Sequence, residues 1–410
     1  MIFQLNSNDG NNNNNDDHDH GRIPMNKYEY YSRILDGLLA ENLYRRLRDV
    51  KIIDSSRAIV DGKHVILLCS NDYLGLSSNR YVKESLLSYI NESCISQCSS
   101  RLIAGNDPVL EELEHSLSEH KLMDDALVYT NGYMANLGLA SIMDGSTVVY
   151  SDELNHASII DACRLSKAEV RVFRHNDIDM LRDMLREDTN HKNRIIITEG
   201  IFSMDGDIAE LRELSRLSDE YNTILVVDEA HSDFIYGDNY RGMVEHLDAS
   251  ADIIVSSLSK SLGCFGGYTA SNRCIIEYLI NKARAFIYTS ALPTILAYAS
   301  LKALEIVKQG TMQRMLSQNV RYFKDSLLSI GFDVASDTHI IPVVIGDEKD
   351  TLEFASLLLE RGVYAQAVRY PTVPRGKARI RVTLTALHSR DDLEHAVEAF
   401  KYAGEELALI

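Results

Sequence analysis

The chain has 410 residues, of which 45% are hydrophobic and 25% are charged, which is typical of a globular protein and excludes a wholly disordered or collagen-like chain. Its 42 basic and 60 acidic side chains give a net charge of −18, and such an acidic surface disfavours nucleic acid as a general partner. No apolar stretch approaches the roughly 18 uninterrupted residues that a membrane-spanning helix needs, so we expect no membrane span.

Residues 1–24 differ in composition from the rest of the chain. An asparagine run at 11–15 is followed by alternating Asp and His side chains, with too few apolar residues to form a packed core. We therefore expect a disordered acidic and Asn-rich tail without the features of a secretory signal. From about Tyr28, apolar residues recur at three- and four-residue spacing and predict an N-terminal helical segment over 25–66.

From residue 67 to residue 304, short apolar runs alternate with helix-like stretches. The runs cover 126–129, 148–150, 171–173, 195–198, 224–227 and 253–255. Continuous apolar runs of this length, separated by helices, are typical of parallel strands buried on both faces. The pattern predicts a large α/β domain with a doubly wound, mainly parallel sheet.

The pattern changes near residue 305. A long helical stretch is followed by short apolar runs, another helix and a final helix that begins at Arg390. The stretches after residue 305 are a helix over 312–328, runs at 332–334 and 340–345, a helix over 350–361, and runs at 363–368 and 379–385. This order predicts a smaller C-terminal α+β domain over 305–410.

The most specific chemical signal lies at the ends of two neighbouring runs. Asp228 and His231 follow the run 224–227, and Lys260 lies in the Ser- and Gly-rich loop after 253–255. Pyridoxal phosphate requires an amine for a Schiff base, a carboxylate that keeps the pyridine nitrogen protonated, and small residues around its phosphate. Alone, the aspartate would be a strand-end helix cap and the lysine a surface residue, but together they predict this cofactor.

Three further polar clusters follow other runs. They are Asn131-Gly132-Tyr133, where a helix begins, then His156, and then Ser203 with the turn after it. Backbone N–H groups at a helix start suit a phosphate, and an imidazole can stack on a flat heteroaromatic ring. Each cluster alone would be an ordinary turn or loop, but their repetition at successive strand ends predicts one shared site.

From about residue 28 to its end, the chain resembles the α-oxoamine synthases, a family of fold-type I pyridoxal-phosphate enzymes. The resemblance rests on motifs in a fixed order: NDYLGL (71–76), SSRLIAGN (99–106), NGYMAN (131–136), NHAS (155–158), FRHND (173–177), SMDG (203–206), DEAH (228–231), SLSKSLG (257–263), YTSALP (288–293), RYPTVPRG (369–376) and ARIRVTLTALH (378–388). It implies a transferase with the aminotransferase class I/II fold, which joins an amino acid to an acyl-CoA and releases CO₂ and CoA.

The same resemblance implies roles for the cofactor residues. Lys260 would carry pyridoxal phosphate and move the α-proton of the amino acid, and Asp228 would pair with the pyridine N–H. His231 and Ser203 would lie beside the phenolic oxygen, and His156 would stack on the ring. The residues expected at the phosphate are Asn131, Gly132, Tyr133 and Ser257, with Thr289 and Ser290 reaching the phosphate of the neighbouring subunit. The last two imply a homodimer with a shared active site.

For the substrate, the resemblance implies that Arg381 binds the carboxylate of the amino acid, a task that suits a bidentate guanidinium. Arg369 takes the second arginine position of the same region, and Asn71 lines the pocket. SSRLIAGN and RYPTVPRG are most similar to the branch that makes 8-amino-7-oxononanoate for biotin biosynthesis. That branch uses L-alanine and a pimeloyl thioester, either pimeloyl-CoA or a pimeloyl-carrier protein.

Several alternatives stay open at this point. Leu102 stands where aminolevulinate synthases have Asn, which argues against succinyl-CoA, but glycine C-acetyltransferase (2-amino-3-ketobutyrate CoA ligase) and serine palmitoyltransferase remain possible. The chain also departs from the family pattern at two places. Cys98-Ser99 replaces the usual Gly-Gly, and this change bears on the preference for the acyl chain. Ser256-Ser257 replaces the usual Gly-Thr. An aminotransferase would share the fold, whereas a silent scaffold would be expected to lose a catalytic side chain.

The six cysteines are scattered and form no paired CxxC motif. We therefore expect no metal site, and free thiols in a reducing, cytoplasmic compartment.

Overall fold

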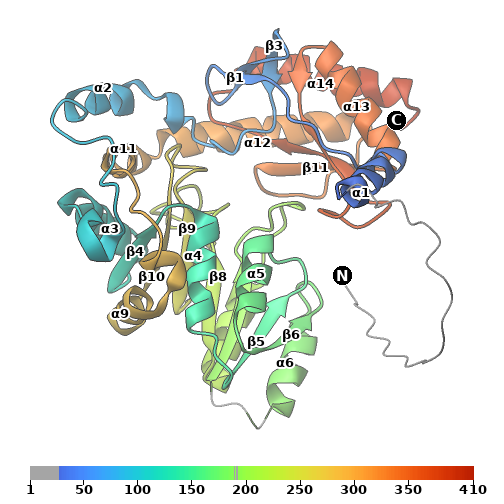
Figure 1. Ribbon diagram of the computed structural model, residues 1–410. Coiled ribbons are helices and arrows are strands. Elements are labelled where there is room, and N and C mark those ends of the chain that lie inside the picture. Colours follow the sequence, from blue (N-terminus) through green and yellow to red (C-terminus); the bar gives the residue numbers. More distant parts are fainter. Residues whose placement is uncertain (1–26, 189, 191–192) are drawn as a thin grey trace, which may run out of the picture.

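The computed structural model describes residues 27–188, 190 and 193–410 (Figure 1), so the tail expected at 1–24 lies outside the described residues. A seven-stranded sheet has the order β4-β10-β9-β8-β7-β5-β6. Its strands are β4 (Asp125–Tyr129), β5 (Thr147–Asp152), β6 (Glu169–Phe173), β7 (Asn193–Glu199), β8 (Ile224–Asp228), β9 (Ile253–Ser257) and β10 (Gly267–Ser271). Each of the six predicted apolar runs lies in one of these strands, which confirms the mainly parallel α/β sheet.

Strand β10 is the addition that the sequence pattern did not predict. It runs antiparallel to both β9 and β4, whereas β6, β5, β7, β8 and β9 pair in parallel. The sequence of β10, GYTAS, mixes small and polar residues, yet all five residues are buried, because strands pair with both of its edges and helices α3 (Pro108–Lys121) and α4 (Gly132–Gly138) contact it. Its burial comes from its position in the fold and not from its own hydropathy.

Both faces of the sheet are covered, as the continuous apolar runs predicted. Val226 of β8 belongs to one core, while its neighbours Leu225 and Val227 belong to the core on the opposite face. The first core includes side chains of α4 (Gly132–Gly138), α5 (Ala157–Leu165), α9 (Arg273–Lys282) and α10 (Arg284–Ile287). The second includes side chains of α6 (Ile178–Glu187), α7 (Leu211–Tyr221) and α8 (Met243–His246). Alternation along each strand thus fills two cores.

Three other helices complete this part of the chain: α2 (Arg80–Tyr89), α3 (Pro108–Lys121) and α11 (Thr294–Val307). Short 3₁₀ turns lie at Leu76–Ser78 and Leu139–Ser141, and a π-helical turn spans Arg101–Gly105. Helix α11 continues across residues 304 and 305, between the two predicted domains. The division of the chain into domains therefore stays a prediction.

The C-terminal part holds an antiparallel sheet in the order β11-β14-β13. Its elements are α12 (Thr311–Ser329), β11 (Ile340–Gly346), α13 (Glu348–Glu360), β13 (Gln366–Val368), β14 (Ala378–Thr383) and α14 (Arg390–Glu406). Two details differ from the sequence pattern. The run 332–334 forms no strand and instead buries Phe332 and Val334 in the core, and the run 363–368 divides between two different sheets.

The segment 25–66, expected to be helical, holds one helix followed by three strands. These are α1 (Glu29–Ala40), β1 (Val50–Ile52), β2 (Arg57–Val60) and β3 (Lys63–Leu67). Strand β3 pairs in parallel with β12 (Val363–Tyr364), so the strands of 50–67 lie against the C-terminal part of the chain (Figure 1). Helix α1 has no buried residue, and Tyr31, Ile34 and Leu35 on it are exposed.

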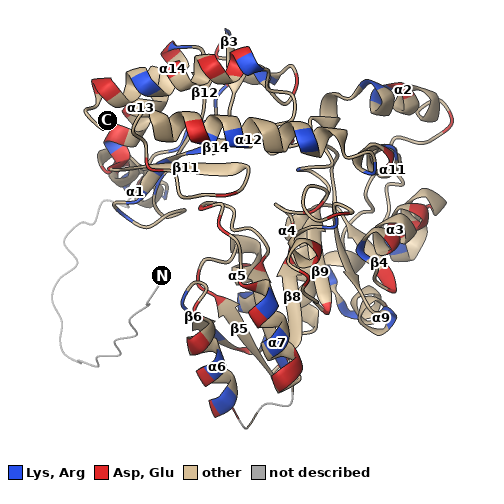
Figure 2. Ribbon diagram, turned by 180° about the vertical axis from the view of Figure 1, so that it is seen from behind, with Lys and Arg blue, Asp and Glu red and all other residues tan. Residues whose placement is uncertain are grey.

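Acidic and basic segments are interspersed along the outer helices α6, α7, α12 and α14 (Figure 2). In the described part of the chain, none of the helices has the length and hydropathy needed to cross a membrane.

Candidate active site

Lys260, His231 and Asp228 come together at the carboxyl ends of β8 and β9. The Nζ atom of Lys260 lies 2.9 Å from Nε2 of His231. Asp228, the last residue of β8, accepts hydrogen bonds from Asn136 Nδ2 at 2.7 Å and from the Ala230 N–H at 2.9 Å. The order of the strands therefore places the predicted amine, imidazole and carboxylate in one cluster.

Burial controls protonation in this cluster. Desolvation lowers the pKa of Lys260 to about 8, although the charges of Asp228 and Glu199 act in the opposite direction. Burial also holds the pKa of His231 well below its usual range, and the positive charges of Lys260 and Arg381 add to this effect. The cluster therefore offers an amine that is partly unprotonated near neutral pH and a neutral imidazole.

The predicted phosphate site, called here the phosphate seat, lies where the start of α4 meets the end of β9 and the start of β10. Asn131 caps α4 through its side chain, which accepts the Met134 N–H at 2.9 Å. A Cβ atom added to Gly132 would lie 3.2 Å from the Cβ of Ser257, and one added to Gly267 would lie 2.4 Å from the Gly132 nitrogen. Only glycine allows the backbones to approach this closely, which leaves a narrow cradle of N–H and hydroxyl groups.

His156 caps α5 and accepts the Ser158 N–H at 3.2 Å through Nδ1, so its ring is fixed at the end of β5. The ring of Tyr133 approaches it edge-on, with centroids 6.4 Å apart. Thr289 and Ser290 line a small hollow with Thr130, which directly precedes the phosphate seat.

The C-terminal part contributes Arg381 from strand β14. Its Nε donates to the main-chain oxygen of Ser203 at 2.6 Å, and its NH1 group lies 3.4 Å from Asn71 Oδ1. Three predicted residues from distant segments are thus joined in one group. Arg369 is placed differently, since it donates to the main-chain oxygens of Asn42 and Tyr44. It lines a cavity of about 640 Å³ beside the chain that follows α1.

Three residues in the cluster were not assigned from the sequence. The hydroxyl of Tyr73 lies 2.7 Å from His231 Nδ1, and Asn136 binds Asp228 as described above. Glu199 is the register partner of Asp228 on β7, and its buried Oε1 has no hydrogen-bond partner in the described structure. Burial, and then the charge of Asp228, holds the pKa of Glu199 well above its usual range. A carboxylate directly after an apolar run was the available signal for Glu199.

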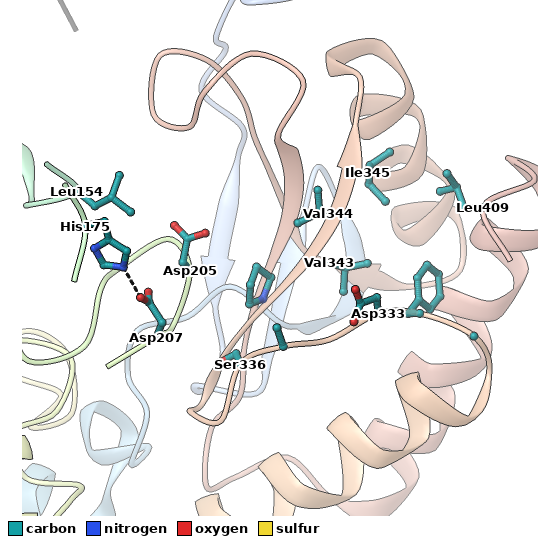
Figure 3. A pocket seen from close by; sticks show the side chains of 14 residues that line it. Leu154, His175, Asp205, Asp207, Asp333, Ser336, Val343, Val344, Ile345 and Leu409 are labelled. Carbon is teal, nitrogen blue, oxygen red and sulfur yellow. Dashed lines mark hydrogen bonds and ion pairs between the residues drawn. The ribbon is translucent and has the colours of Figure 1, made fainter. Parts of the chain in front are cut away.

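A second group of charges adjoins the loop 203–206. His175 bridges two carboxylates, with Nδ1 3.0 Å from Asp152 and Nε2 2.5 Å from Asp207. Burial alone would lower the pKa of His175, but its two carboxylate partners outweigh burial and raise it to about 10. Figure 3 shows His175 and Asp207 on one wall of a cavity of about 580 Å³, with apolar side chains of β11 on the other wall.

The arrangement fits pyridoxal phosphate. Lys260 supplies the amine, Asp228 a buried carboxylate, and Gly132 with Ser257 a cradle that a Cβ atom would crowd.

Comparison with known proteins agrees with this chemistry. The family model described as aminotransferase class I and II matches residues 63–400. The chain belongs to this family. It is 41% identical to the 8-amino-7-oxononanoate synthase of Thermoanaerobacter pseudethanolicus, over 93% of this chain and 98% of the relative. It is 42% identical to that of Symbiobacterium thermophilum, over 92% of this chain and 97% of the relative.

Solved structures show the same relationship. A serine palmitoyltransferase of Sphingomonas wittichii superimposes with a TM-score of 0.89 at 28% identity, covering 95% of this chain and 100% of that chain. An 8-amino-7-oxononanoate synthase of Francisella tularensis gives 0.72 at 27% identity, covering 84% and 99%. Serine palmitoyltransferase has been solved with pyridoxal phosphate. The chain is therefore a pyridoxal-phosphate-dependent acyltransferase of the α-oxoamine synthase family, which confirms the predicted family, fold class and cofactor.

Proposed function

We propose that this protein condenses L-alanine with a pimeloyl thioester, releases CO₂ and CoA, and forms 8-amino-7-oxononanoate for biotin biosynthesis. The observation that carries the proposal is the match of about 40% identity to 8-amino-7-oxononanoate synthases along nearly the whole chain. The cluster of Lys260, His231 and Asp228 supports it, since it supplies the groups that this chemistry needs.

The residues of the cluster divide the work among them. When bound, pyridoxal phosphate supplies an electron sink for the negative charge that develops on Cα of the amino acid. The carboxylate of Asp228 would hold a proton on the pyridine nitrogen, which keeps that sink effective. Lys260 Nζ, whose pKa is lowered to about 8, is suited to take the proton from Cα and return it later.

Binding and orientation are assigned to the other side chains. Arg381 would bind the substrate carboxylate beside Asn71, because its guanidinium is buried and already fixed by Ser203. His156 would hold the cofactor ring from one face, and Asn131, Gly132, Tyr133 and Ser257 would hold its phosphate. His231 would act at the phenolic oxygen together with Ser203.

We further propose that the enzyme is a homodimer, with Thr289 and Ser290 completing the phosphate site of the neighbouring subunit. The exposed apolar face of α1 supports an association of this kind, because isolated monomers rarely leave such a face uncovered. The acyl donor is a CoA or carrier-protein thioester, and the compartment is the cytoplasm. Sedimentation of the purified enzyme tests the dimer directly.

A second candidate is serine palmitoyltransferase, which would use L-serine and a palmitoyl thioester. It is favoured by one observation, the higher TM-score of 0.89 against 0.72 for the 8-amino-7-oxononanoate synthase structure. The sequence identities of 41% and 28% favour the first candidate.

The two candidates separate in a single assay. The holoenzyme is incubated with L-alanine, glycine or L-serine, each with pimeloyl-, acetyl- or palmitoyl-CoA, and release of free thiol is followed. We expect the highest kcat/KM for L-alanine with pimeloyl-CoA. A higher value for L-serine with palmitoyl-CoA, or for glycine with acetyl-CoA, would reject the proposal.

A further inference from the structure

A continuous chain of hydrogen-bonding side chains connects Lys260 to Arg381 through the interior of the site. Lys260 Nζ lies 2.9 Å from His231 Nε2, and His231 Nδ1 lies 2.7 Å from the hydroxyl of Tyr73. That hydroxyl is 3.0 Å from Asn71 Oδ1, which in turn is 3.4 Å from Arg381 NH1. Both ends of the chain are cationic groups that can only donate when charged.

The imidazole at its centre is neutral. The groups that act on His231 are Lys260, Arg381, His339 and His156, and each of them, like burial itself, lowers its pKa. A neutral imidazole carries its single proton on either Nδ1 or Nε2, and its hydrogen-bond partners decide which.

The direction of each hydrogen bond in this series follows from its Arg381 end, because a guanidinium can only donate. Asn71 Oδ1 is an acceptor, and the donating guanidinium of Arg381 opposes the flipped amide, which would point an NH₂ group at it. The one hydroxyl proton of Tyr73 therefore goes to Asn71 Oδ1. His231 Nδ1 must then donate to the Tyr73 oxygen, which leaves Nε2 without a proton and facing Lys260.

We propose that Tyr73 is a positioning residue that fixes His231 in its Nδ1–H tautomer, so that a bare Nε2 accepts a hydrogen bond from Lys260. The inference concerns the site of the proposed function but rests only on the hydrogen-bond network within this chain. Packing supports the geometry, because Tyr73 is fully buried and the ring of His339 meets it edge-on at 4.0 Å between centroids. The tyrosine therefore has little freedom to redirect its hydroxyl.

The tautomer of His231 affects the protonation state of Lys260. A bare Nε2 accepts an N–H from either the charged or the neutral amine, whereas an Nε2–H could only donate to the neutral amine. Tyr73→Phe removes the acceptor for Nδ1–H and would leave a buried donor without a partner, so the proton should move to Nε2. The variant should then favour unprotonated Lys260 and lower its pKa further.

The first test reads the tautomer directly in the apo-enzyme, so it does not depend on turnover. Ring ¹⁵N resonances of labelled histidine are recorded, and those of His231 are assigned by their loss in His231→Gln. We expect a protonated Nδ1 and an unprotonated Nε2 in the wild type. A protonated Nε2 in the wild type would overturn the proposal, and this measurement needs no variant that might unfold.

The second test measures the pKa of Lys260 in the apo-enzyme by competitive amine labelling and peptide mass spectrometry across pH. In Tyr73→Phe the midpoint should fall by about one pH unit, the equivalent of one net hydrogen bond. Tyr236→Phe is the matched control, because it removes a hydroxyl that lies 3.1 Å from His339 Nδ1 and takes no part in the series of hydrogen bonds from Lys260 to Arg381.

Melting temperatures establish that both variants are folded. An unchanged midpoint in Tyr73→Phe, or an equal shift in Tyr236→Phe, would show that Tyr73 has only a structural role. Because neither test uses a substrate, failure of the proposed acyltransferase reaction would leave their outcome unaffected.

Discussion

Arg379 forms an ion pair with Asp205 and donates from Nε to the main-chain oxygen of Lys377 at 3.1 Å, so its guanidinium is already engaged. Arg381 lies two residues further along the same strand and points to the same side. Its NH1 group lies beside Asn71, and its positive charge lowers the pKa of both Lys260 and His231. Both arginines therefore bind the loop 203–206, Arg379 through Asp205 and Arg381 through Ser203, but only Arg381 also reaches Asn71.

Arg381→Ala should weaken the binding of L-alanine by about 2–5 kcal/mol, because a carboxylate loses a fixed, buried cationic partner. Cofactor binding should persist, since Lys260, Asp228 and the phosphate seat remain. Titration of L-alanine, followed through the absorbance of the bound cofactor, measures the effect. If Arg379→Ala loses alanine binding while Arg381→Ala retains it, the carboxylate site has been assigned to the wrong arginine.

Lys260→Ala should abolish thiol release while the protein stays folded, because no other amine among the motif residues can replace Lys260 Nζ. Lys302→Ala, which removes a surface lysine paired with Glu305, is the control and should retain activity. In the wild-type apo-enzyme, the rate of cofactor uptake should rise with pH through about 8, where burial places the pKa of Lys260. A midpoint near 10.5, the ordinary value for lysine, would contradict the buried amine.

Asp228→Asn should reduce kcat by about 10²–10⁴-fold without unfolding the protein, because an amide cannot stabilise a positive charge on the pyridine nitrogen. Asp252→Asn is a matched control, since Asp252 accepts the Leu225 N–H at 2.7 Å in the loop that leads into the neighbouring strand. Steady-state rates of the two variants measure whether Asp228 acts in catalysis. A loss below about tenfold in Asp228→Asn would mean that Asp228 is only a structural cap.

His175→Gln should lower the free energy of unfolding by about 1.5–3 kcal/mol at pH 6, because a charged imidazole loses two carboxylate partners. The folded-state pKa of His175 is raised from 6.5 to about 10. The stabilisation is therefore complete below about pH 6.5 and is lost as the pH rises through about 10.

Urea unfolding of His175→Gln and the wild type at pH 6 and near pH 10 measures this difference. His115→Gln, at an exposed pair with Glu119, is the control and should change little at either pH. A loss in His175→Gln that is equal at both pH values would show that packing and not charge is responsible.

The sequence predicted the fold correctly where buried residues form a continuous apolar run. Runs such as 224–227 predicted strands that are buried on both faces, and Asp228 and Lys260 could be assigned because they follow such runs directly. Strand β10 was not predicted because Gly267–Ser271 is buried by the strands and helices around it and is not marked by an apolar sequence. The strands of 50–67 were missed for a related reason, since β1 is exposed and β2 and β3 carry charged residues at their ends.

Tyr73 shows a different limit. Its motif was recognised, but its contact with His231 joins residues 158 positions apart, and only the folded chain brings them together. The role of Arg369 in substrate binding stays a prediction from its motif, and in this structure its guanidinium donates to the main-chain oxygens of Asn42 and Tyr44. Local patterns therefore located the strand ends, whereas tertiary packing decided which side chains meet there.

Identification of the product tests the proposed condensation. Purified holoenzyme is supplied with pimeloyl-CoA and with L-alanine labelled with ¹³C at its carboxylate, and the products are analysed by mass spectrometry. The proposed condensation would give unlabelled 8-amino-7-oxononanoate, labelled CO₂ and one free CoA for each turnover. Formation of a keto acid with the label retained, or no condensation product under conditions where L-serine or glycine reacts with another acyl-CoA, would contradict it.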